Sequence, residues 1–412
     1  MELKPGYKQT EVGVIPENWQ QSKIGDIASS ARNSVVGGPF GSDLVSADYV
    51  DFGVPVIRGQ NMGERWVSGN FAFVTSEKAN SLSANLARPD DIVFTQRGTL
   101  GQVSLVPENS HKRYLVSQSQ MKVSLNREIA DPLFFYYVFS STEQQDQIRQ
   151  NTIQTGVPHI NLGILRELPV QLPPLSEQRA IAAALSDTDA LLSSLDRLLA
   201  KKRDIKQAVM QQLLTGRQRL PGFTGEWEVK RLGEICQIGM GRTPSRRMQA
   251  FWGKGYPWLS IADLKTKYVS ETKEEITPLA ASSMTVIPKG TLIMSFKLSI
   301  GRMAFTARDM YSNEAICSFG DLKMNADFLY YVLGKADFSL YGKQAVKGFT
   351  LNSESLRIIG VPHPPLDEQT AIAAVLSDLD AEIDALQQRR DKTRAIKQGM
   401  MQELLTGRTR LV

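Results

Sequence analysis

The feature that most constrains the fold is an internal repeat. The chain reads PPLSEQRAIAAALSD at Pro173–Asp187 and PPLDEQTAIAAVLSD at Pro364–Asp378, an offset of 191 positions with no gap. The match extends from Pro173–Leu220 to Pro364–Leu411, with about 29 of 48 positions identical. An identity this long indicates a duplication, so the chain must fold as two related halves.

The segments before each copy also repeat, but more faintly. GVPVIRGQNM at Gly53 corresponds to GYPWLSIADL at Gly255, and FFYYV at Phe134 corresponds to FLYYV at Phe328. The offsets drift between about 194 and 208, which indicates loops of different lengths. The order is therefore a variable part, a nearly constant segment, a second variable part and a second constant segment.

The constant segments have the pattern of long helices. A Pro-Pro pair precedes each, Ser176 and Asp367 are suitable N-caps, and Gly216 and Gly407 follow the last Leu-Leu-Thr. About 40 residues at 1.5 Å each give a helix of roughly 60 Å. Such a helix is too long for one small core.

Apolar residues at heptad spacing predict how these helices pack. We expect helix–helix packing at Leu185, Leu192, Leu195, Leu199, Leu376, Ile383 and Leu386. Two such helices can pair as an antiparallel coiled coil, with a change of phase before Ile205 and Ile396. The alternative is two amphipathic helices, each packed on its own domain.

The variable parts have short β-type runs such as VPVIRG and DIVFTQ, followed by helical segments. We therefore expect an α+β fold. Two globular α/β domains, residues 1–172 and 217–362, are joined by two long antiparallel coiled-coil helices, residues 173–216 and 363–412, in a pseudo-twofold arrangement.

Most enzymatic motifs are absent from the sequence. No GxxxxGK[ST] and no complete GxGxxG occurs, and the three histidines have no metal-ligand spacing, so we predict no catalytic residue and no metal site. The N-terminus has no apolar signal region, no apolar run reaches membrane-spanning length, and two cysteines do not form a disulfide framework. These features lead us to expect a cytoplasmic protein with no membrane partner.

The charge is uneven along the chain. The net charge is +5, yet Ser176–Gly216 carries +1 (6 basic, 5 acidic) and Asp367–Gly407 carries −3 (5 basic, 8 acidic). The remainder therefore carries +7, so the basic excess belongs to the variable parts. This excess is compatible with nucleic acid.

The duplicated PPLxEQxxIAxxLSxxD…LLTGR pattern, around two divergent parts, resembles the specificity subunits of type I restriction-modification systems. The resemblance covers essentially the whole chain, including the opening YKQTEVGVIPENWQQSKIGDIA. It implies that the variable parts are target recognition domains, each reading one half of a bipartite, asymmetric site in double-stranded DNA. The helices would set the spacing and dock two modification (methyltransferase) subunits.

The same resemblance implies that this chain is not an enzyme and binds no cofactor itself. The modification subunits would hold S-adenosylmethionine, and restriction subunits would add translocation and cleavage with ATP and Mg.

DNA recognition requires positive charge for phosphates and polar side chains for base edges. In the first half, Arg, Gln and Asn follow a predicted strand, and a Gly/Pro-bounded loop in the second half is basic. The candidate DNA-binding residues are Arg58, Gln60, Asn61, Arg65, Arg97, Lys112, Arg113, Arg242, Arg246, Arg247, Lys265, Lys297, Arg302 and Lys347.

Three other interpretations stay open on the sequence. The chain can be the recognition subunit of a related enzyme in which cleavage and methylation are fused, a coiled-coil scaffold whose globular parts bind protein, or a standalone enzyme. The missing motifs disfavour the last.

Overall fold

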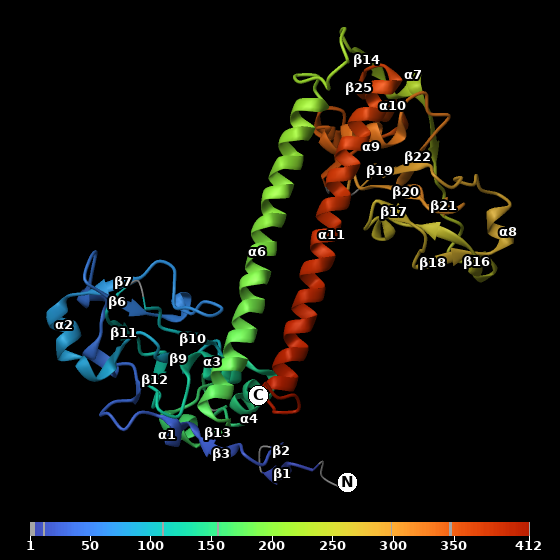
Figure 1. Ribbon diagram of the computed structural model, residues 1–412. Coiled ribbons are helices and arrows are strands. Elements are labelled where there is room, and N and C mark those ends of the chain that lie inside the picture. The colour runs from blue at the N-terminus through green and yellow to red at the C-terminus, as the bar shows by residue number, and fades with distance from the viewer. Residues whose placement is uncertain are drawn as a thin grey trace. The chain divides into compact units, whose positions relative to one another are not determined.

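The structure is a computed structural model that describes residues 5–10, 13–108, 111–154, 156–297, 299–345 and 348–411. The chain divides into two compact units, and each combines distant parts of the sequence. Unit 1 comprises Met1–Leu195 with Arg389–Val412, and unit 2 comprises Asp196–Gln388. Each unit holds a region of short strands and a part of both long helices (Figure 1). The bounds of the four segments expected from the sequence stay a prediction.

The repeated segments form two helices of 39 residues, α6 (Leu175–Leu213) and α11 (Leu366–Leu404). Each begins directly after its Pro-Pro pair, since proline suits the first turn of a helix but not its interior. Beyond each end lies a glycine with positive φ, Gly216 at +67° and Gly407 at +71°. This conformation is the common way to stop a helix, because glycine adopts it without a Cβ clash.

Within each unit, α6 and α11 run antiparallel. In unit 1, Lys397 Nζ lies 2.6 Å from the Asp189 carboxylate, and Thr188 contacts Met400. In unit 2, Lys202 pairs with Glu382 at 2.5 Å, and Lys206 pairs with Asp380. In both units, higher residue numbers on one helix meet lower numbers on the other. The expected antiparallel pairing is therefore confirmed.

The residues predicted to pack between the two helices are buried to different degrees. Five of the seven are buried, namely Leu185, Leu195, Leu199, Leu376 and Ile383. Leu192 and Leu386 are only half-buried. Polar Thr393 is buried where the heptad pattern of α11 breaks.

Unit 1 contains two principal sheets. The first has the order β10-β9-β12-β4 and is antiparallel throughout. Its strands are β4 (Val35–Gly37), β9 (Ile92–Thr95), β10 (Val103–Leu105) and β12 (Gln120–Val123). The second has the order β5-β7-β6-β11-β8, in which β6 and β11 are parallel. Its strands are β5 (Tyr49–Val50), β6 (Val54–Ile57), β7 (Ala72–Val74), β8 (Leu86–Ala87) and β11 (Tyr114–Val116).

Short elements complete unit 1. Two strand pairs, β1 (Tyr7–Thr10) with β2 (Gly13–Pro16) and β3 (Gln20–Lys23) with β13 (Pro169–Leu172), flank the sheets. The helices are α1 (Ile24–Ile27), α2 (Ser76–Ser81), α3 (Pro132–Ser140), α4 (Thr142–Gln150) and α5 (Leu162–Glu167).

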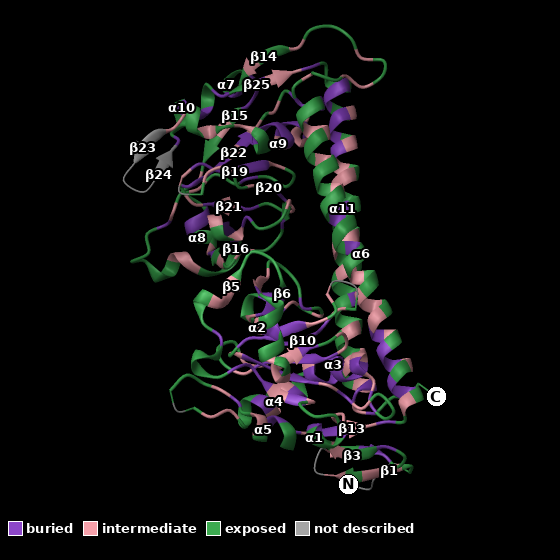
Figure 2. Ribbon diagram, turned by 90° about the vertical axis from the view of Figure 1, so that its left-hand side faces the viewer, coloured by how far each residue is buried: buried purple, intermediate pink, exposed green. Residues whose placement is uncertain are grey.

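Aromatic residues of α3 join the sheet region of unit 1 to the long helices. Most of α3 is buried (Figure 2), and its Phe134, Phe135 and Phe139 are fully buried. They share one core with Ile181 and Leu185 of α6 and with Leu404 of α11. Burying a phenylalanine contributes about 1.5–3 kcal/mol, so this core fixes the sheets to the helix pair.

Unit 2 repeats the design with different loops. Its main sheet has the order β15-β22-β19-β20-β17, and a second has the order β18-β16-β21. The strands are β14 (Glu228–Arg231), β15 (Gln237–Met240), β16 (Trp252–Leu259), β17 (Tyr268–Val269), β18 (Glu274–Ile276), β19 (Leu292–Ser295), β20 (Met303–Thr306), β21 (Tyr311–Ser312), β22 (Ile316–Gly320), β23 (Lys343–Ala345), β24 (Gly348–Thr350) and β25 (Gly360–His363).

The helices of unit 2 are α7 (Leu232–Ile235), α8 (Pro278–Ala281), α9 (Ala326–Lys335) and α10 (Ser353–Arg357). Phe328 and Tyr331 of α9 pack with Leu213 of α6 and Leu376 of α11 in one core. This is the counterpart of the α3 core of unit 1. A search of the described helices finds no stretch apolar and long enough to cross a membrane.

Candidate nucleic-acid interface

The Glu of each PPLxEQ motif is a buried structural anchor. In unit 1, Arg410 Nε and Nη2 lie 2.5 and 2.8 Å from the Glu177 carboxylate, and Trp19 Nε1 donates to it at 2.9 Å. In unit 2, Arg219 binds Glu368 at 2.5 and 2.6 Å, and Trp227 Nε1 donates at 3.1 Å. We name these two arrangements the clamps. Each joins the tail of one long helix to the start of the other.

The clamps explain why the tails of the repeats end in LLTGRxRL. The two carboxylates are buried, with side-chain exposures of 1% and 0%, and a buried charge is tolerated only when it is paired. The bond to Glu177 raises the pKa of Arg410, and the bond to Glu368 raises the pKa of Arg219. Both guanidinium groups therefore stay charged.

The Gln of each motif positions the recognition part of its unit. Gln178 Oε1 accepts from the backbone N–H of Asp131, the N-cap of α3, at 2.8 Å. Gln369 Oε1 accepts from the backbone N–H of Asn325, the N-cap of α9, at 2.8 Å. Sequence reasoning missed Trp19, Glu177 and Gln178 as working residues. Their recurrence in both copies was the available signal.

A second repeated contact joins α3 in unit 1 and α9 in unit 2 to the long helices. Tyr137 donates to Asp189 at 2.7 Å, and Tyr331 donates to Asp380 at 2.6 Å. Burial and these carboxylates raise the pKa of both tyrosines well above the ordinary range. The tyrosines stay protonated and serve as donors.

Arg65 lies at this junction. Its Nη1 donates to Ser186 of α6 at 3.1 Å, and its guanidinium lies over Trp66. The corresponding Lys267 pairs with Asp327 at 2.7 Å. Arg65 therefore braces unit 1 from within. Its predicted contact with DNA stays a prediction, and this position argues against it.

The loop after β6 carries three of the predicted DNA residues in different settings. Asn61 is buried, accepts from Arg58 N at 3.2 Å, and donates to the carbonyls of Ser68 and Asn70. Its amide is therefore occupied in holding the turn. Gln60 is exposed and donates to Asn70 O at 3.0 Å, while Arg58 is half-buried. Of these three residues, Gln60 is the exposed one, whereas the Nε of Arg58 is buried.

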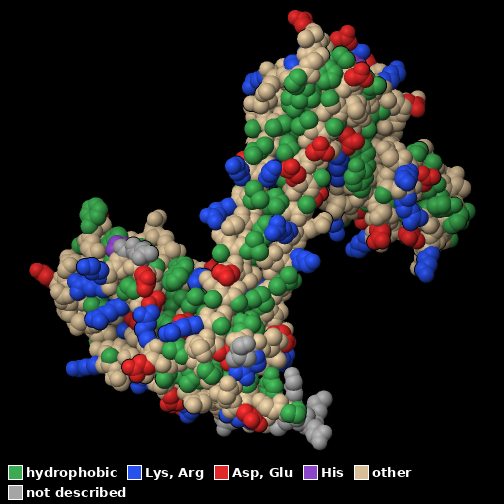
Figure 3. Space-filling model, viewed as in Figure 1, with side chains coloured by type: hydrophobic (Ala, Val, Ile, Leu, Met, Phe, Trp, Pro, Cys, Tyr) green, Lys and Arg blue, Asp and Glu red, His purple; other side chains and the backbone are tan. Residues whose placement is uncertain are grey.

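Three more predicted residues of unit 1 lie on its surface. Arg97 is exposed at the end of β9, and Lys112 is exposed before β11. Arg113 donates to Asn80 Oδ1 of α2 at 2.6 Å. Lys and Arg side chains gather on the face of unit 1 around α2 and β11 (Figure 3). This face offers positive charge for phosphates.

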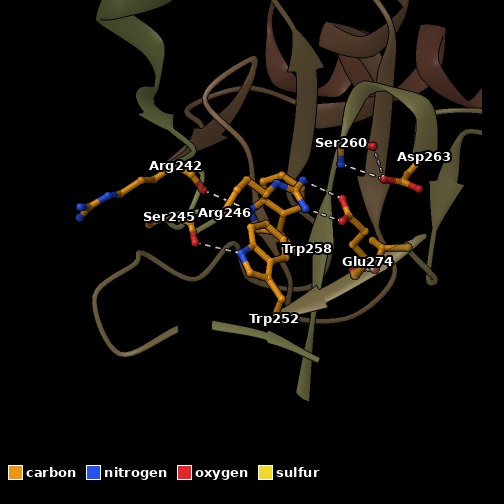
Figure 4. A network of polar contacts seen from close by, with 9 residues as sticks. Arg242, Ser245, Arg246, Trp252, Trp258, Ser260, Asp263 and Glu274 are labelled. Atoms are coloured by element: carbon orange, nitrogen blue, oxygen red, sulfur yellow. Dashed lines mark hydrogen bonds and ion pairs between the residues drawn. The ribbon is translucent and has the colours of Figure 1, made fainter. Parts of the chain in front are cut away.

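The basic loop of unit 2 is held by two tryptophans. Arg246 lies 3.8 Å from the ring centroid of Trp252 and forms a bidentate pair with Glu274, at 2.5 and 2.8 Å (Figure 4). The pair lowers the pKa of Glu274. Arg242 contributes its carbonyl to Trp258 Nε1 at 3.1 Å, and its side chain points away from this cluster (Figure 4).

These contacts divide the predicted residues of unit 2. The side chain of Arg246 is held within the loop by the contacts just described. Arg242 and Arg247 are exposed, and their side chains have no partner in the described part of the chain. Lys265 and Arg302 are exposed, and Lys297 is half-buried with Nζ over the ring of Phe296. Lys347 lies outside the described residues. Exposed cations therefore remain on several loops of unit 2.

The turn after β6 in unit 1 and the turn after β16 in unit 2 have the same backbone conformation. Arg58 precedes the turn Gly59–Asn61 with φ −118° and ψ 170°, and Ser260 precedes Ile261–Asp263 with φ −115° and ψ 168°. Asn61 and Asp263 each accept the backbone N–H of the residue that begins the turn. The change from Asn61 to Asp263 therefore keeps the turn, while the exposed residue before it differs, Gln60 in unit 1 and Ala262 in unit 2.

No group of three or more His, Cys, Asp or Glu side chains that could hold a metal occurs among the residues described. The arrangement is thus one of surface cations and amides on rigid loops. Such groups can bind phosphates and base edges.

Comparison with known proteins agrees with this geometry. A family model described as "Type I restriction modification DNA specificity domain" matches residues 16–202 and again residues 224–393. Among curated proteins, the chain is similar to the putative type I restriction enzyme MjaX specificity subunit of Methanocaldococcus jannaschii. The two are 23% identical over 98% of this chain and 97% of the relative. The MjaVIII specificity subunit of the same organism is 22% identical over 96% and 94%.

Solved structures show the same fold. The type I restriction-modification S subunit from M. genitalium matches with a TM-score of 0.58 and 18% identity, over 98% of this chain and 99% of that one. The HsdS subunit from Thermoanaerobacter tengcongensis matches with a TM-score of 0.52 and 19% identity, over 96% and 98%.

Proposed function

The chain belongs to the family of type I restriction-modification DNA specificity subunits, and we propose that each of its two units reads one half of a bipartite, asymmetric DNA site. The observation that carries this proposal is the double family match, one on each half of the chain. Members of this family are the non-catalytic components that select the DNA sequence. The chain is accordingly a recognition subunit and not an enzyme.

The asymmetry of the site follows from the side chains at equivalent loop positions. Arg58 and Gln60 in unit 1 stand where unit 2 has Ser260 and Ala262. Arginine and glutamine can form bidentate bonds to guanine and adenine in the major groove, whereas serine and alanine make smaller contacts. Two loops of one shape with different side chains support two different half-sites.

The helices α6 and α11 are proposed to set the spacing of the half-sites and to dock two modification subunits. The proposed docking surface includes Leu198 and Ile205 of α6, whose side chains are 39% and 38% exposed. They are seven residues apart, so they lie on one face of the helix. Exposed aliphatic side chains on one face of a helix are more favourable in contact with a partner protein than in contact with water.

The chemistry is proposed to belong to partner subunits. S-adenosylmethionine would bind the modification subunits, ATP and Mg would serve restriction subunits, and this chain would bind none of them. Complex formation on chromosomal DNA would place the assembly in the cytoplasm.

Co-purification with its modification subunit, followed by mapping of methylated adenines, tests the proposal. A complex that methylates one asymmetric bipartite sequence supports it. Capture of a single protein with fused cleavage and methylation would favour the related fused enzyme instead. Tight binding to proteins without selective binding to DNA would favour a scaffold, and methylation or cutting by the purified chain alone would make it an enzyme.

A further inference from the structure

Phe40 of unit 1 is an aromatic side chain that the fold holds out in solvent. It is 83% exposed, in the turn that follows β4. Burial of a phenylalanine is favourable, so leaving one fully outside forgoes stability. A second exposed phenylalanine, Phe52, is 86% exposed in the same unit and offers a matched comparison.

The turn that carries Phe40 is tightly built. A Cβ on Gly38 would lie 2.0 Å from the carbonyl oxygen of Ser117, so only glycine allows this approach. Gly38 N donates to Gln120 O at 3.0 Å, and Gln118 Nε2 donates to Gly41 O at 2.7 Å. Gly41 has φ +48°, a conformation that favours glycine. The backbone on both sides of Phe40 is therefore fixed before any ligand binds.

A hollow of about 510 Å³ with both apolar and polar lining residues lies beside this turn. Its lining includes Phe40, Gln96, Arg97, Gln118 and Asn161. Arg97 is exposed, and its guanidinium has no partner within the described residues. An aromatic ring, side-chain amides and an unpaired cation thus border one hollow. Those groups match a base, the sugar edge and a phosphate of DNA.

The equivalent turn of unit 2 is built differently. Gly37 is opposite Met121 and Met240 is opposite Cys317 in corresponding sheets, which aligns Gly38 with Gly241 and Phe40 with Thr243. Thr243 donates to Glu314 and lowers the pKa of that carboxyl. At this position unit 2 therefore has a threonine bonded to a carboxylate in place of an exposed aromatic ring.

We propose that Phe40 inserts as an apolar wedge between base pairs of the half-site read by unit 1, while Arg97 holds the flanking phosphate. The proposal rests on the function proposed above and names a specificity-determining residue for it. A wedge partly unstacks one base step and makes recognition depend on how easily that step deforms. A rigid turn suits this role because little conformational freedom is lost on binding.

The test uses the complete complex of this chain with its modification subunit. The probe is a duplex with 2-aminopurine placed in turn at each position of both half-sites, because this base fluoresces more when it is unstacked. We expect the wild type to increase fluorescence at one step of the half-site read by unit 1. Phe40→Ala should abolish the increase and weaken binding about tenfold or more, as loss of a base–aromatic contact does.

Matched variants separate this contact from general damage. Phe40→Trp should keep the fluorescence increase, Phe52→Ala should behave as wild type, and the half-site read by unit 2 should respond to neither. Arg97→Gln should reduce the slope of log affinity against log salt by about one, the effect of one lost phosphate contact.

Several outcomes would overturn the wedge. Equal binding and fluorescence with Phe40→Ala and Phe52→Ala would overturn it. Loss of the modification subunit from the Phe40→Ala complex would also overturn it, because that result would assign Phe40 to a protein interface. A wild-type complex without selective DNA binding would overturn the proposed function itself, whereas selective binding that ignores Phe40 overturns the wedge alone.

Discussion

Replacing Arg410 by glutamine tests the unit 1 clamp. Within the described residues, the Glu177 carboxylate accepts two hydrogen bonds from Arg410 and one from Trp19. With the guanidinium gone, a carboxylate whose side chain is 1% exposed loses its counter-charge. Removing one partner of a buried pair costs about 3–5 kcal/mol. Because Arg410 is itself 23% exposed and water can replace part of its contact, we expect about 3 kcal/mol.

Native-state hydrogen exchange measures this loss locally, which is needed because two units need not unfold together. The informative amides are those of Gln178, which donates to Pro174 O at 3.0 Å, and of Asp131, which donates to Gln178. A cost of about 3 kcal/mol corresponds to roughly a hundredfold faster exchange of these amides. Amides of unit 2 should be unchanged, because that unit has its own clamp at Glu368.

Arg408→Gln is the matched control, since Arg408 lies in the same tail, is 61% exposed, and only approaches Glu403 at 4.0 Å. It should cost between about 0 and 1 kcal/mol. Glu177→Gln combined with Arg410→Gln should cost less than the sum of the single changes, since each removes the same interaction. The clamp would be refuted if Arg410→Gln accelerated exchange no more than Arg408→Gln.

Further predictions concern spacing, recognition and pH. Matched four-residue insertions after Ala200 and Leu386 lengthen both helices by about 6 Å. The methylation map should then show a gap about two base pairs longer, with both half-sites unchanged. An unchanged gap would contradict the proposal that the helices set the spacing of the half-sites. Gln60→Ala should lower discrimination at one half-site in a binding assay, and equal losses at both half-sites would count against this loop. Asn61→Ala should instead lower the free energy of unfolding by about 1–3 kcal/mol. Burial raises the pKa of Cys236 from 9.0 to about 11. The stability that the neutral Cys236 thiol contributes is therefore present below about pH 9 and is lost as pH rises through about 11. Unfolding midpoints of the wild type should fall more over this window than those of Cys236→Ala, and parallel curves for the two proteins would argue against this contribution.

Much of the fold could be predicted because its determinants are local and repeated. The Pro-Pro starts, the Leu-Leu-Thr-Gly ends and the heptads predicted α6 and α11, which lie inside the expected segments. Leu185 and Leu376 are buried, and their packing between the two helices stays a prediction. Leu192 and Leu386 are half-buried, because heptad periodicity does not report how closely a partner helix approaches each position.

The candidate site was harder to predict because contacts between distant residues decide which cations are free. Arg65 and Arg246 have the composition of DNA-binding residues, yet one is bonded to Ser186 and the other is paired with Glu274. The clamps join residues 149 and 233 positions apart, and no local pattern pairs them. Phe40 carries no charge and so escaped a search for basic and amide side chains.

A genome-wide map of methylated adenines, from a host carrying this chain and its modification subunit, tests the central claim most directly. Two units with different loops on one chain predict a single asymmetric motif, made of two unlike half-sites separated by a fixed, unread gap. A continuous or palindromic motif, produced by an active complex, would contradict the assignment of one half-site to each unit.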